Sequence, residues 1–314
     1  MSGSTTYLDK LAARTRSVRS VLCVGLDPQV DALPDGFRRD LSGVERFCEI
    51  LLDATVPYAA AVKPNLAFFE AFGSPGIAAL ERLRGRIPSD VPFVGDAKRG
   101  DIGTTAARQA AALFDILGCD AITANPYLGS EAIEPLISRG DRFAYVLCRT
   151  SNPGAAELQS LEVAADPRTG APAEPLYARV ARRAHNWGPG GTVGLVVGAT
   201  APVELERIRA IAPELAMLVP GVGAQGGDVD PVLRHGPATA PPAAGRAGGG
   251  LLINVSRGIS MAALGAATTP GAATTPGAGP TPGAATPPGT RPLDVGERLA
   301  AAAAEWAERL RVAI

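Results

Sequence analysis

Eight short apolar runs recur along the chain, and helical patterns separate them. Runs rich in Val, Ile, Leu and Ala are typical of parallel strands that are buried on both faces, and their alternation with helices indicates a sheet covered by helices. The runs are residues 21–28, 59–63, 91–98, 120–124, 143–148, 192–197, 215–219 and 251–255. Eight such units predict an α/β fold, a (β/α)8 TIM barrel. A doubly wound open sheet is the alternative, but it calls for a GxGxxG turn after the first strand, and residues 25–28 (GLDP) provide none.

Two segments fall outside this pattern. Residues 265–291 consist almost entirely of Ala, Thr, Pro and Gly. That composition cannot bury a core, so we predict a disordered, low-complexity insertion before the last helix. Residues 236–250 are a milder case, predicted to be a flexible loop rich in Gly, Pro and Ala. The predicted organisation is therefore one barrel domain, made of residues 1–264 and 292–314.

Polar residues stand at the ends of almost all the predicted strands. In a (β/α)8 barrel, chemistry takes place at the C-terminal ends of the strands. Packing of the barrel requires no polar residue there, so a functional rim is favoured over a structural one. The rim residues are Asp27, Lys63, Asp96, Lys98, Asn125, Arg149, Thr150, Ser151, Asn152, Gln225 and Arg257.

The most highly charged part of this rim is residues 94–103 (VGDAKRGDIG). Asp96, Lys98 and Asp101 alternate in sign at the point where a buried strand emerges. Residues 96 and 98 of a strand point the same way, so Asp96 and Lys98 are predicted to share one face. A structural ion pair at the strand end is the alternative interpretation.

The scarcity of lysine favours the functional interpretation. Among the 30 basic residues only Lys10, Lys63 and Lys98 are lysines, and the others are arginines. Arginine evidently serves wherever a positive charge suffices. A lysine retained against that background can supply a compact charge or a proton that is given up. Lys63 and Lys98 both stand at predicted strand ends, which indicates a chemical role for them.

The last two strand ends predict a phosphate site. Residues 220–228 (PGVGAQGGD) offer backbone N–H groups with few side chains in the way, and residues 254–258 (NVSRG) add the guanidinium of Arg257. Glycine-rich loops after strands 7 and 8 commonly bind phosphate in this fold, and arginine can hold a phosphate by two hydrogen bonds. Two ordinary tight turns are the alternative. The combination indicates a phosphate monoester as substrate.

Global features argue against several other classes of protein. A net charge of −1 provides no field that favours nucleic acid or an anionic membrane surface. No apolar run is long enough to span a bilayer, and residues 1–20 lack the apolar core of a signal peptide, so we expect a cytoplasmic protein. The four scattered cysteines are expected to be free, buried thiols. The chain has only two histidines, which argues against a histidine-based metal site and against a Ser/His/Asp triad.

Residues 96–103 (DAKRGDIG) resemble the D-x-K-x-x-D signature of the orotidine 5′-phosphate decarboxylase family. Residues 25–28, 62–65 (VKPN), 149–155 (RTSNPGA) and 220–227 are similar to other segments of that family and occur in the same order. The KPN and RTSNPG forms resemble its longer bacterial branch. The D-x-K-x-x-D signature by itself is shared with sugar-phosphate relatives, so the full set of segments is what makes the resemblance specific.

This resemblance implies decarboxylation of orotidine 5′-phosphate to UMP and CO2 in de novo pyrimidine biosynthesis, without a cofactor or a metal. Lys63, Asp96, Lys98 and Asp101 would form the catalytic charged array. In the family the last aspartate of the signature reaches the partner subunit's site, so Asp101 implies a homodimer. The implied substrate contacts are Asp27 and Lys63 on the ribose hydroxyls, Thr105 at the ribose end, Ser151 on the pyrimidine, and Gln225 and Arg257 on the phosphate.

Two other functions remain open from the sequence. A metal-dependent sugar-phosphate lyase or synthase of the same barrel superfamily would need added carboxylates near Asp96, and residues 93–95 (FVG) supply none. A non-catalytic barrel that binds nucleotide or acts as a scaffold would not require an intact charged array.

Overall fold

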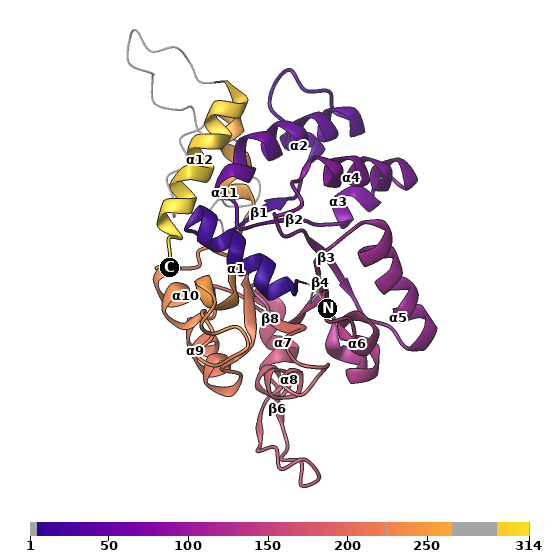
Figure 1. Cartoon of the computed structure of the whole chain (residues 1–314), viewed down its shortest axis with the longest axis vertical. Coiled ribbons are helices and arrows are strands. Elements are labelled where there is room, and N and C mark those ends of the chain that lie inside the picture. The colour runs from indigo at the N-terminus through magenta and orange to yellow at the C-terminus, as the bar shows by residue number, and fades with distance from the viewer. Residues whose placement is uncertain (1–4, 224, 266–293, 314) are drawn as a thin grey trace.

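Eight parallel strands form one nearly closed barrel in the described part of the chain (Figure 1). The computed structural model describes residues 5–223, 225–265 and 294–313. Between the two ends of the sheet the ring is completed by isolated bridges, with a hydrogen bond of 2.9 Å from Val62 N to Pro92 O. The predicted (β/α)8 barrel is confirmed. In sheet order the strands are β2 (Ala61–Pro64), β1 (Leu22–Leu26), β10 (Leu251–Val255), β9 (Ala216–Val219), β8 (Val193–Val197), β5 (Phe143–Arg149), β4 (Ala121–Ala124) and β3 (Val94–Arg99).

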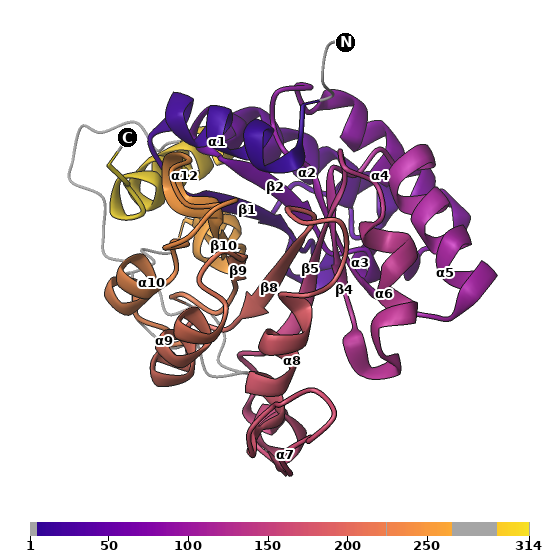
Figure 2. The ribbon, with the colours of Figure 1, turned by 60° about the horizontal axis from the view of Figure 1, so that its bottom comes forward.

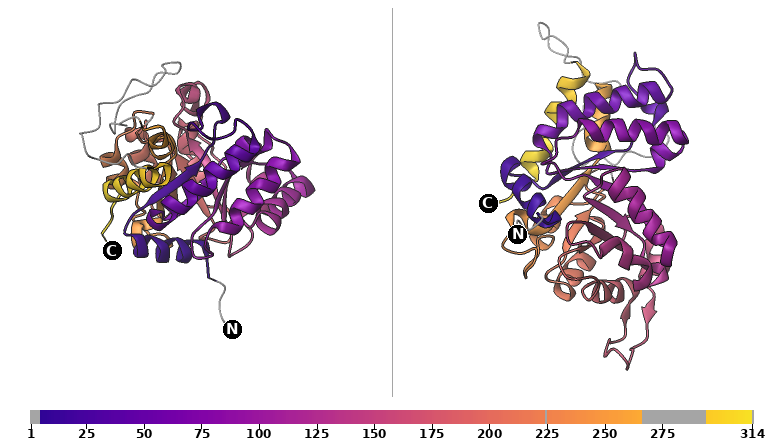
Figure 3. Two further views of the ribbon diagram at one scale, coloured as in Figure 1. Left: turned by 90° about the horizontal axis from the view of Figure 1, so that it is seen from above. Right: turned by 45° about the vertical axis from the view of Figure 1, so that its right-hand side comes forward.

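Helices surround the outer side of the barrel (Figures 2 and 3). Local chemistry sets where they begin. The Asp40 side chain accepts the Gly43 N–H at the start of α2 (Leu41–Thr55), and Asp294 and Glu297 form a capping box at the start of α12 (Val295–Arg309). A short hairpin of β6 (Glu162–Val163) and β7 (Glu174–Pro175) extends away from the barrel (Figure 1). The helices are α1 (Tyr7–Val18), α2 (Leu41–Thr55), α3 (Ala67–Glu70), α4 (Ser74–Arg86), α5 (Gly103–Ala110), α6 (Ser130–Ile137), α7 (Ala156–Gln159), α8 (Leu176–Ala184), α9 (Pro202–Ile211), α10 (Val229–His235), α11 (Arg257–Ser260) and α12 (Val295–Arg309).

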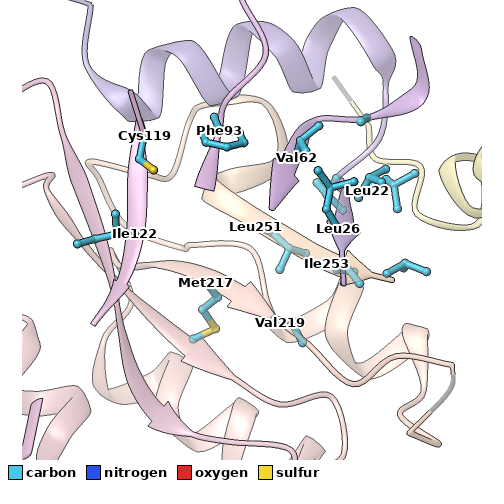
Figure 4. Packing of buried hydrophobic residues seen from close by; sticks show 14 of the residues in the cluster. Leu22, Leu26, Val62, Phe93, Cys119, Ile122, Met217, Val219, Leu251 and Ile253 are labelled. Carbon is cyan, nitrogen blue, oxygen red and sulfur yellow. The ribbon is translucent and has the colours of Figure 1, made fainter. Parts of the chain in front are cut away.

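The strands carry two apolar layers, one on each face. Successive residues of a strand point to opposite faces. Leu22, Val24 and Leu26 of β1 accordingly belong to the cluster that packs against the helices, part of which Figure 4 shows. Cys23, between them, belongs to a second cluster, which fills the barrel interior together with Tyr145 and other inward-facing residues. Each strand therefore has an outward row and an inward row.

Helix α1 covers the N-terminal end of the barrel, although sequence analysis predicts no element there. Tyr7 joins the interior cluster, and its hydroxyl lies 3.0 Å from that of Tyr145. Lys10 Nζ donates to both carboxylate oxygens of Asp120, at 2.7 and 2.8 Å, and Asp120 also accepts the Phe93 N–H at 2.8 Å. Lys10 therefore fastens α1 to the N-terminal end of β4, at the end of the barrel opposite the strand C-termini.

The segments predicted to lie outside the barrel pattern differ in how much of each is described. Residues 236–250 hydrogen-bond to the body of the barrel: Thr239 N donates to Pro213 O at 2.8 Å, and Arg246 Nη2 pairs with Asp9 at 2.9 Å. The flexibility of this loop stays a prediction. Residues 266–291 of the predicted insertion lie outside the described residues. Among the helices of the described ranges, none combines the length and the apolar character needed to cross a bilayer.

Candidate active site

Polar side chains continue the inward rows of the strands at their C-terminal ends. Lys63 stands two residues after Ala61 in β2, and Asp96 stands two residues after Val94 in β3. Ala61 and Val94 both belong to the interior cluster. Because residues two apart in a strand share a face, Lys63 and Asp96 are directed into the C-terminal mouth of the barrel. The rim predicted from the sequence therefore includes an inward-facing charged group.

Lys63, Asp96 and Lys98 form one continuous chain of charges. Asp96 Oδ2 accepts from Lys63 Nζ at 2.7 Å, and Asp96 Oδ1 accepts from Lys98 Nζ at 2.6 Å. The exposed fractions of the three side chains are 4%, 12% and 49% in that order. The Lys63 side chain is thus almost fully buried, while the Lys98 side chain is half exposed at the C-terminal mouth of the barrel. The three side chains by themselves sum to one positive charge, and the carboxylate of Asp27, which also acts on Lys63, balances it.

Burial and pairing act in opposite directions on this array. Burial alone lowers the pKa of Lys63, but the charges of Asp96 and Asp27 outweigh it, and the pKa of this ammonium stands above its usual range. Burial alone raises the pKa of Asp96, but Lys63 and Lys98 outweigh it and hold that carboxyl pKa well below its usual range. Both groups therefore stay charged at neutral pH.

These two shifts affect stability at opposite ends of the pH scale. The depressed pKa of Asp96 stabilises the fold above about pH 4, and this contribution is lost as the pH falls through the depressed value. The raised pKa of Lys63 stabilises the fold below about pH 10, and this contribution is lost as the pH rises through the raised value. Neither contribution changes in the neutral range.

Thr123 joins the array, although sequence analysis does not single it out. Its hydroxyl donates to Asp96 Oδ1 at 2.8 Å and accepts the Lys98 backbone N–H at 2.9 Å. The register of β3 against β4 shifts at this point, and Lys98 has a φ of +47°, which residues other than glycine rarely adopt. Thr123 therefore links the irregular backbone to the carboxylate. The sequence does contain a signal for this role: Thr123 is a single hydroxyl residue in an otherwise apolar strand, two residues after the inward-facing Ala121.

Ser151 and Gln225 come together around Gly221. A Cβ placed on Gly221 would lie 2.9 Å from Ser151 Cβ and 2.8 Å from Gln225 Oε1, so glycine is what leaves room for both side chains. The predicted glycine-rich loop closes on itself, since Gly227 N donates to Gly221 O at 3.1 Å. The loops after β5 and β9 therefore place a hydroxyl and an amide side by side.

Asp27 and Arg257 line a cavity of about 40 Å³ beside β1 and β10. The apolar wall of this cavity lies on the helix-facing side of the strands and is formed by three residues of α2, Phe47, Cys48 and Leu51. Asp27 Oδ1 is buried and has no hydrogen-bond partner among the described residues. The same holds within those ranges for Asn254 Oδ1, which belongs to the inward row of β10 and to which sequence analysis assigns no role. Buried acceptors normally have a donor, so both oxygens are candidates for contact with a ligand hydroxyl.

Asp101 and Thr105 stand apart from the array. Asp101 follows β3, and its Oδ1 accepts the Ile102 N–H at 2.8 Å. Across residues 5–223, 225–265 and 294–313, no hydrogen bond or ion pair joins Asp101 to the array. Thr105 is exposed on α5. The structure therefore brings together three of the four residues of the charged array within one chain and leaves the half-buried Asp101 outside it.

A model of the orotidine 5′-phosphate decarboxylase / HUMPS family matches residues 20–269. The chain belongs to this family. The match includes every sequence-predicted site residue, from Asp27 to Arg257. The candidate site offers ammonium, carboxylate, hydroxyl, amide and guanidinium groups. In the described ranges, no cluster of three or more His, Cys, Asp or Glu side chains is placed to hold a metal ion.

Relatives of the chain carry the decarboxylase name. The orotidine 5′-phosphate decarboxylase of Thermomicrobium roseum is 46% identical over 81% of this chain and 86% of its own length. The structure of Leishmania donovani OMP decarboxylase is 42% identical, with a TM-score of 0.70 over 84% of this chain and 92% of that chain. Leishmania donovani UMP synthase is 44% identical with a TM-score of 0.71, and the match covers 81% of this chain but 52% of that longer chain. Nothing in these comparisons favours the sugar-phosphate or the non-catalytic alternative.

Proposed function

We propose that this protein is a cytoplasmic enzyme that decarboxylates orotidine 5′-phosphate to UMP and CO2, a step of de novo pyrimidine biosynthesis. The observation that carries the proposal is the chain of charges from Lys63 through Asp96 to Lys98, at the mouth of a barrel whose relatives are decarboxylases. The chemistry below uses this chain's own side chains and calls for neither a cofactor nor a metal.

Lys98 is proposed to stabilise and then protonate the carbon that loses CO2. Cleavage of the bond between the pyrimidine ring and its carboxylate leaves the electron pair on the ring carbon. A fixed ammonium beside that carbon stabilises the developing negative charge. The ammonium then donates a proton, so that a C–H bond replaces the broken C–C bond, and the resulting amine regains its proton from water. An arginine could not readily give up that proton.

Asp96 is proposed to act on both the substrate and the lysines. Its carboxylate would lie near the substrate carboxylate, and the repulsion between them disappears when CO2 leaves. It also holds Lys63 and Lys98 through hydrogen bonds of 2.7 and 2.6 Å, which keeps both ammonium groups oriented. The depressed pKa of Asp96 supports this role, because the group must remain ionised throughout.

The remaining site residues are proposed to bind the nucleotide. The buried Oδ1 of Asp27, which has no hydrogen-bond partner among the described residues, and the buried position of Lys63 support contact with the ribose hydroxyls. Thr105 of a second copy would lie near the ribose end. The approach of Ser151 and Gln225 around Gly221 supports a binding surface for the pyrimidine and the phosphate. Arg257 would complete the phosphate site from the other side.

A homodimer is proposed to complete the site. Ile102, Tyr127 and Leu128 are large apolar side chains with exposed fractions of 56%, 81% and 51%. They lie on neighbouring loops, since Asn125 N donates to Arg99 O at 2.7 Å across the ends of β3 and β4. A two-fold partner seated on this surface would cover the apolar groups. It would also bring each Asp101, next to Ile102, toward the other copy's mouth.

The proposed function predicts turnover without added metal. Purified protein mixed with orotidine 5′-phosphate in EDTA should produce UMP and CO2, followed by the loss of substrate absorbance and confirmed by chromatography of the product. Strict dependence on a divalent cation would support the sugar-phosphate alternative instead. Binding of UMP with no turnover would support the non-catalytic barrel.

Thr123→Val should lower kcat roughly ten- to hundredfold with little change in KM, because hydrogen bonds to charged groups are worth about 1.5–3 kcal/mol. Valine keeps the shape of the side chain but removes the hydroxyl that joins Asp96 to the Lys98 backbone. Thr123→Ser retains that hydroxyl and should recover most of the activity. Steady-state kinetics of the three proteins provides the measurement.

Thr55→Val is the matched control for this experiment. Thr55 is also fully buried, and its hydroxyl donates to Leu51 O at 2.7 Å within α2, away from the array. This variant should lose stability while its kcat stays unchanged. Equal kinetic effects of the two substitutions would mean that Thr123 acts only through general stability.

A further inference from the structure

The C-terminal helix α12 packs one face against the barrel, beside α2 and α11 (Figure 1). Its buried side chains Leu299, Ala303 and Trp306 recur at the spacing of one helical face, and Leu310 continues that face at the helix end. Trp306 is the largest of them and is almost fully buried. Its position places an indole ring under the C-terminal ends of the last two strands.

The Trp306 ring touches two loops that are far apart in sequence. A Cβ placed on Gly223, in the loop after β9, would lie 3.0 Å from Cη2 and 3.1 Å from Cζ2 of the indole. A Cβ placed on Gly258, just after β10, would lie 2.9 Å from Nε1 and 3.1 Å from Cε2. Both glycines therefore leave the space that the ring occupies, and one rigid ring bridges the two loops.

Two further contacts fix the ring in this position. Its Nε1–H donates to Gly258 O at 3.2 Å, which sets the ring edge against the loop after β10. Over the face of the ring, the guanidinium carbon of Arg309 lies 4.3 Å from the ring centroid, within range of a cation–π interaction. The ring is therefore held in place by Arg309 of its own helix and by Gly258 of the loop after β10.

These two loops carry the proposed phosphate ligands. Gln225 lies two residues after Gly223, and Arg257 directly precedes Gly258. The distance between the amide and the guanidinium depends on how the two loops are spaced, and Trp306 lies between the loops at that point. A phosphate that is bound by Gln225 and Arg257 together requires these two side chains to be held at a fixed separation.

We propose that Trp306 is a positioning residue for phosphate binding, which makes the C-terminal helix part of the substrate-binding machinery. The proposal rests on the phosphate role proposed above for Gln225 and Arg257. Trp306 does not itself contact the phosphate. It holds the two loops at the separation at which their side chains can bind the ligand together.

Trp306→Phe is the informative substitution. Phenylalanine keeps most of the apolar packing but removes the N–H that bonds Gly258 O and the wider part of the ring that contacts Gly223. We expect the affinity for UMP to fall about tenfold, as for loss of one hydrogen bond and displacement of one ligand. KM for orotidine 5′-phosphate should rise by a similar factor with kcat changed less than about twofold. Affinity for uridine, which lacks the phosphate, should stay unchanged. Trp187→Phe, the same substitution at the chain's other tryptophan, is the control and should alter none of these values.

The Trp187→Phe protein also leaves Trp306 as the sole fluorescent tryptophan, which allows a test that needs neither turnover nor a folded Trp306 variant. Titration with UMP or inorganic phosphate should change its emission, and uridine at the same concentrations should not. A phosphate-dependent response without decarboxylation would overturn the proposed reaction and keep this inference. Normal turnover with no response of Trp306 to phosphate would overturn the inference and keep the reaction. Equal losses of UMP and uridine affinity in Trp306→Phe would also overturn it, because they would indicate a general structural effect.

Discussion

Lys98→Ala is expected to lower kcat for decarboxylation of orotidine 5′-phosphate by at least about 10⁴-fold, because it removes the ammonium that we propose both stabilises the carbanion and protonates it. The fold should survive. The Lys98 side chain is half exposed, and Asp96 keeps Lys63 as a partner at 2.7 Å, so no buried charge is left unpaired. Progress curves at high enzyme concentration, with thermal unfolding measured on the same sample, test both halves of this expectation.

Two companion variants separate the explanations. Lys10→Ala makes the same substitution at the opposite end of the barrel, where Lys10 holds Asp120. It should lower stability and leave turnover intact. Lys98→Arg keeps a positive charge but cannot readily release a proton, so it should also be nearly inactive if proton donation is required. Activity of Lys98→Ala above a few per cent of the parent would contradict the proposed mechanism.

The barrel could be predicted because its determinants are local. Each strand is a short apolar run that ends in a turn-forming or polar residue, and burial on both faces leaves a signal that needs no knowledge of neighbours. The site residues Lys63 and Asp96 could be placed for the same reason. Once a strand end is located, the two-residue period assigns each side chain to the inward row. The sequence does not predict helix α1, because the apolar face of that helix is narrow within a mostly polar segment.

Contacts that depend on the pairing of distant segments could not be predicted in this way. Thr123 is visible in the sequence as a hydroxyl in an apolar strand, but its bonds to Asp96 and to the Lys98 backbone depend on a shifted register between β3 and β4. Trp306 likewise reads as one apolar residue of an amphipathic helix. Its contacts with Gly223 and Gly258 exist only because the helix docks beneath two particular loops.

Substitution of Asp101 is expected to give the second large loss of kcat, and this loss depends on the proposed pairing of two subunits. Asp101→Asn should leave the chain folded, because an amide oxygen can still accept the Ile102 N–H. In the proposed homodimer, removal of its charge from the neighbouring mouth should nevertheless reduce kcat by about 10²–10³-fold. Under this proposal Lys98→Ala and Asp101→Asn are each expected to be nearly inactive alone, the first because it lacks the proposed acid and the second because it lacks the carboxylate proposed to come from the partner.

Mixing these two inactive proteins should restore activity. In a mixed dimer, the site on the Asp101→Asn chain keeps its own Lys98 and receives an intact Asp101 from the Lys98→Ala chain. Random pairing of equal amounts in a two-fold dimer would repair about a quarter of all sites. Co-expression with two different tags, purification of the mixed dimer and kinetic assay provide the measurement. The matched control pairs Lys98→Ala with Asp96→Asn, whose defects both lie in the chain's own mouth, so no combination repairs a site. If Asp101 served its own chain, the first mixture would be as inactive as this control, since each chain would carry one defect in its only site. Recovery in the first mixture and none in the second can arise only if Asp101 crosses the interface.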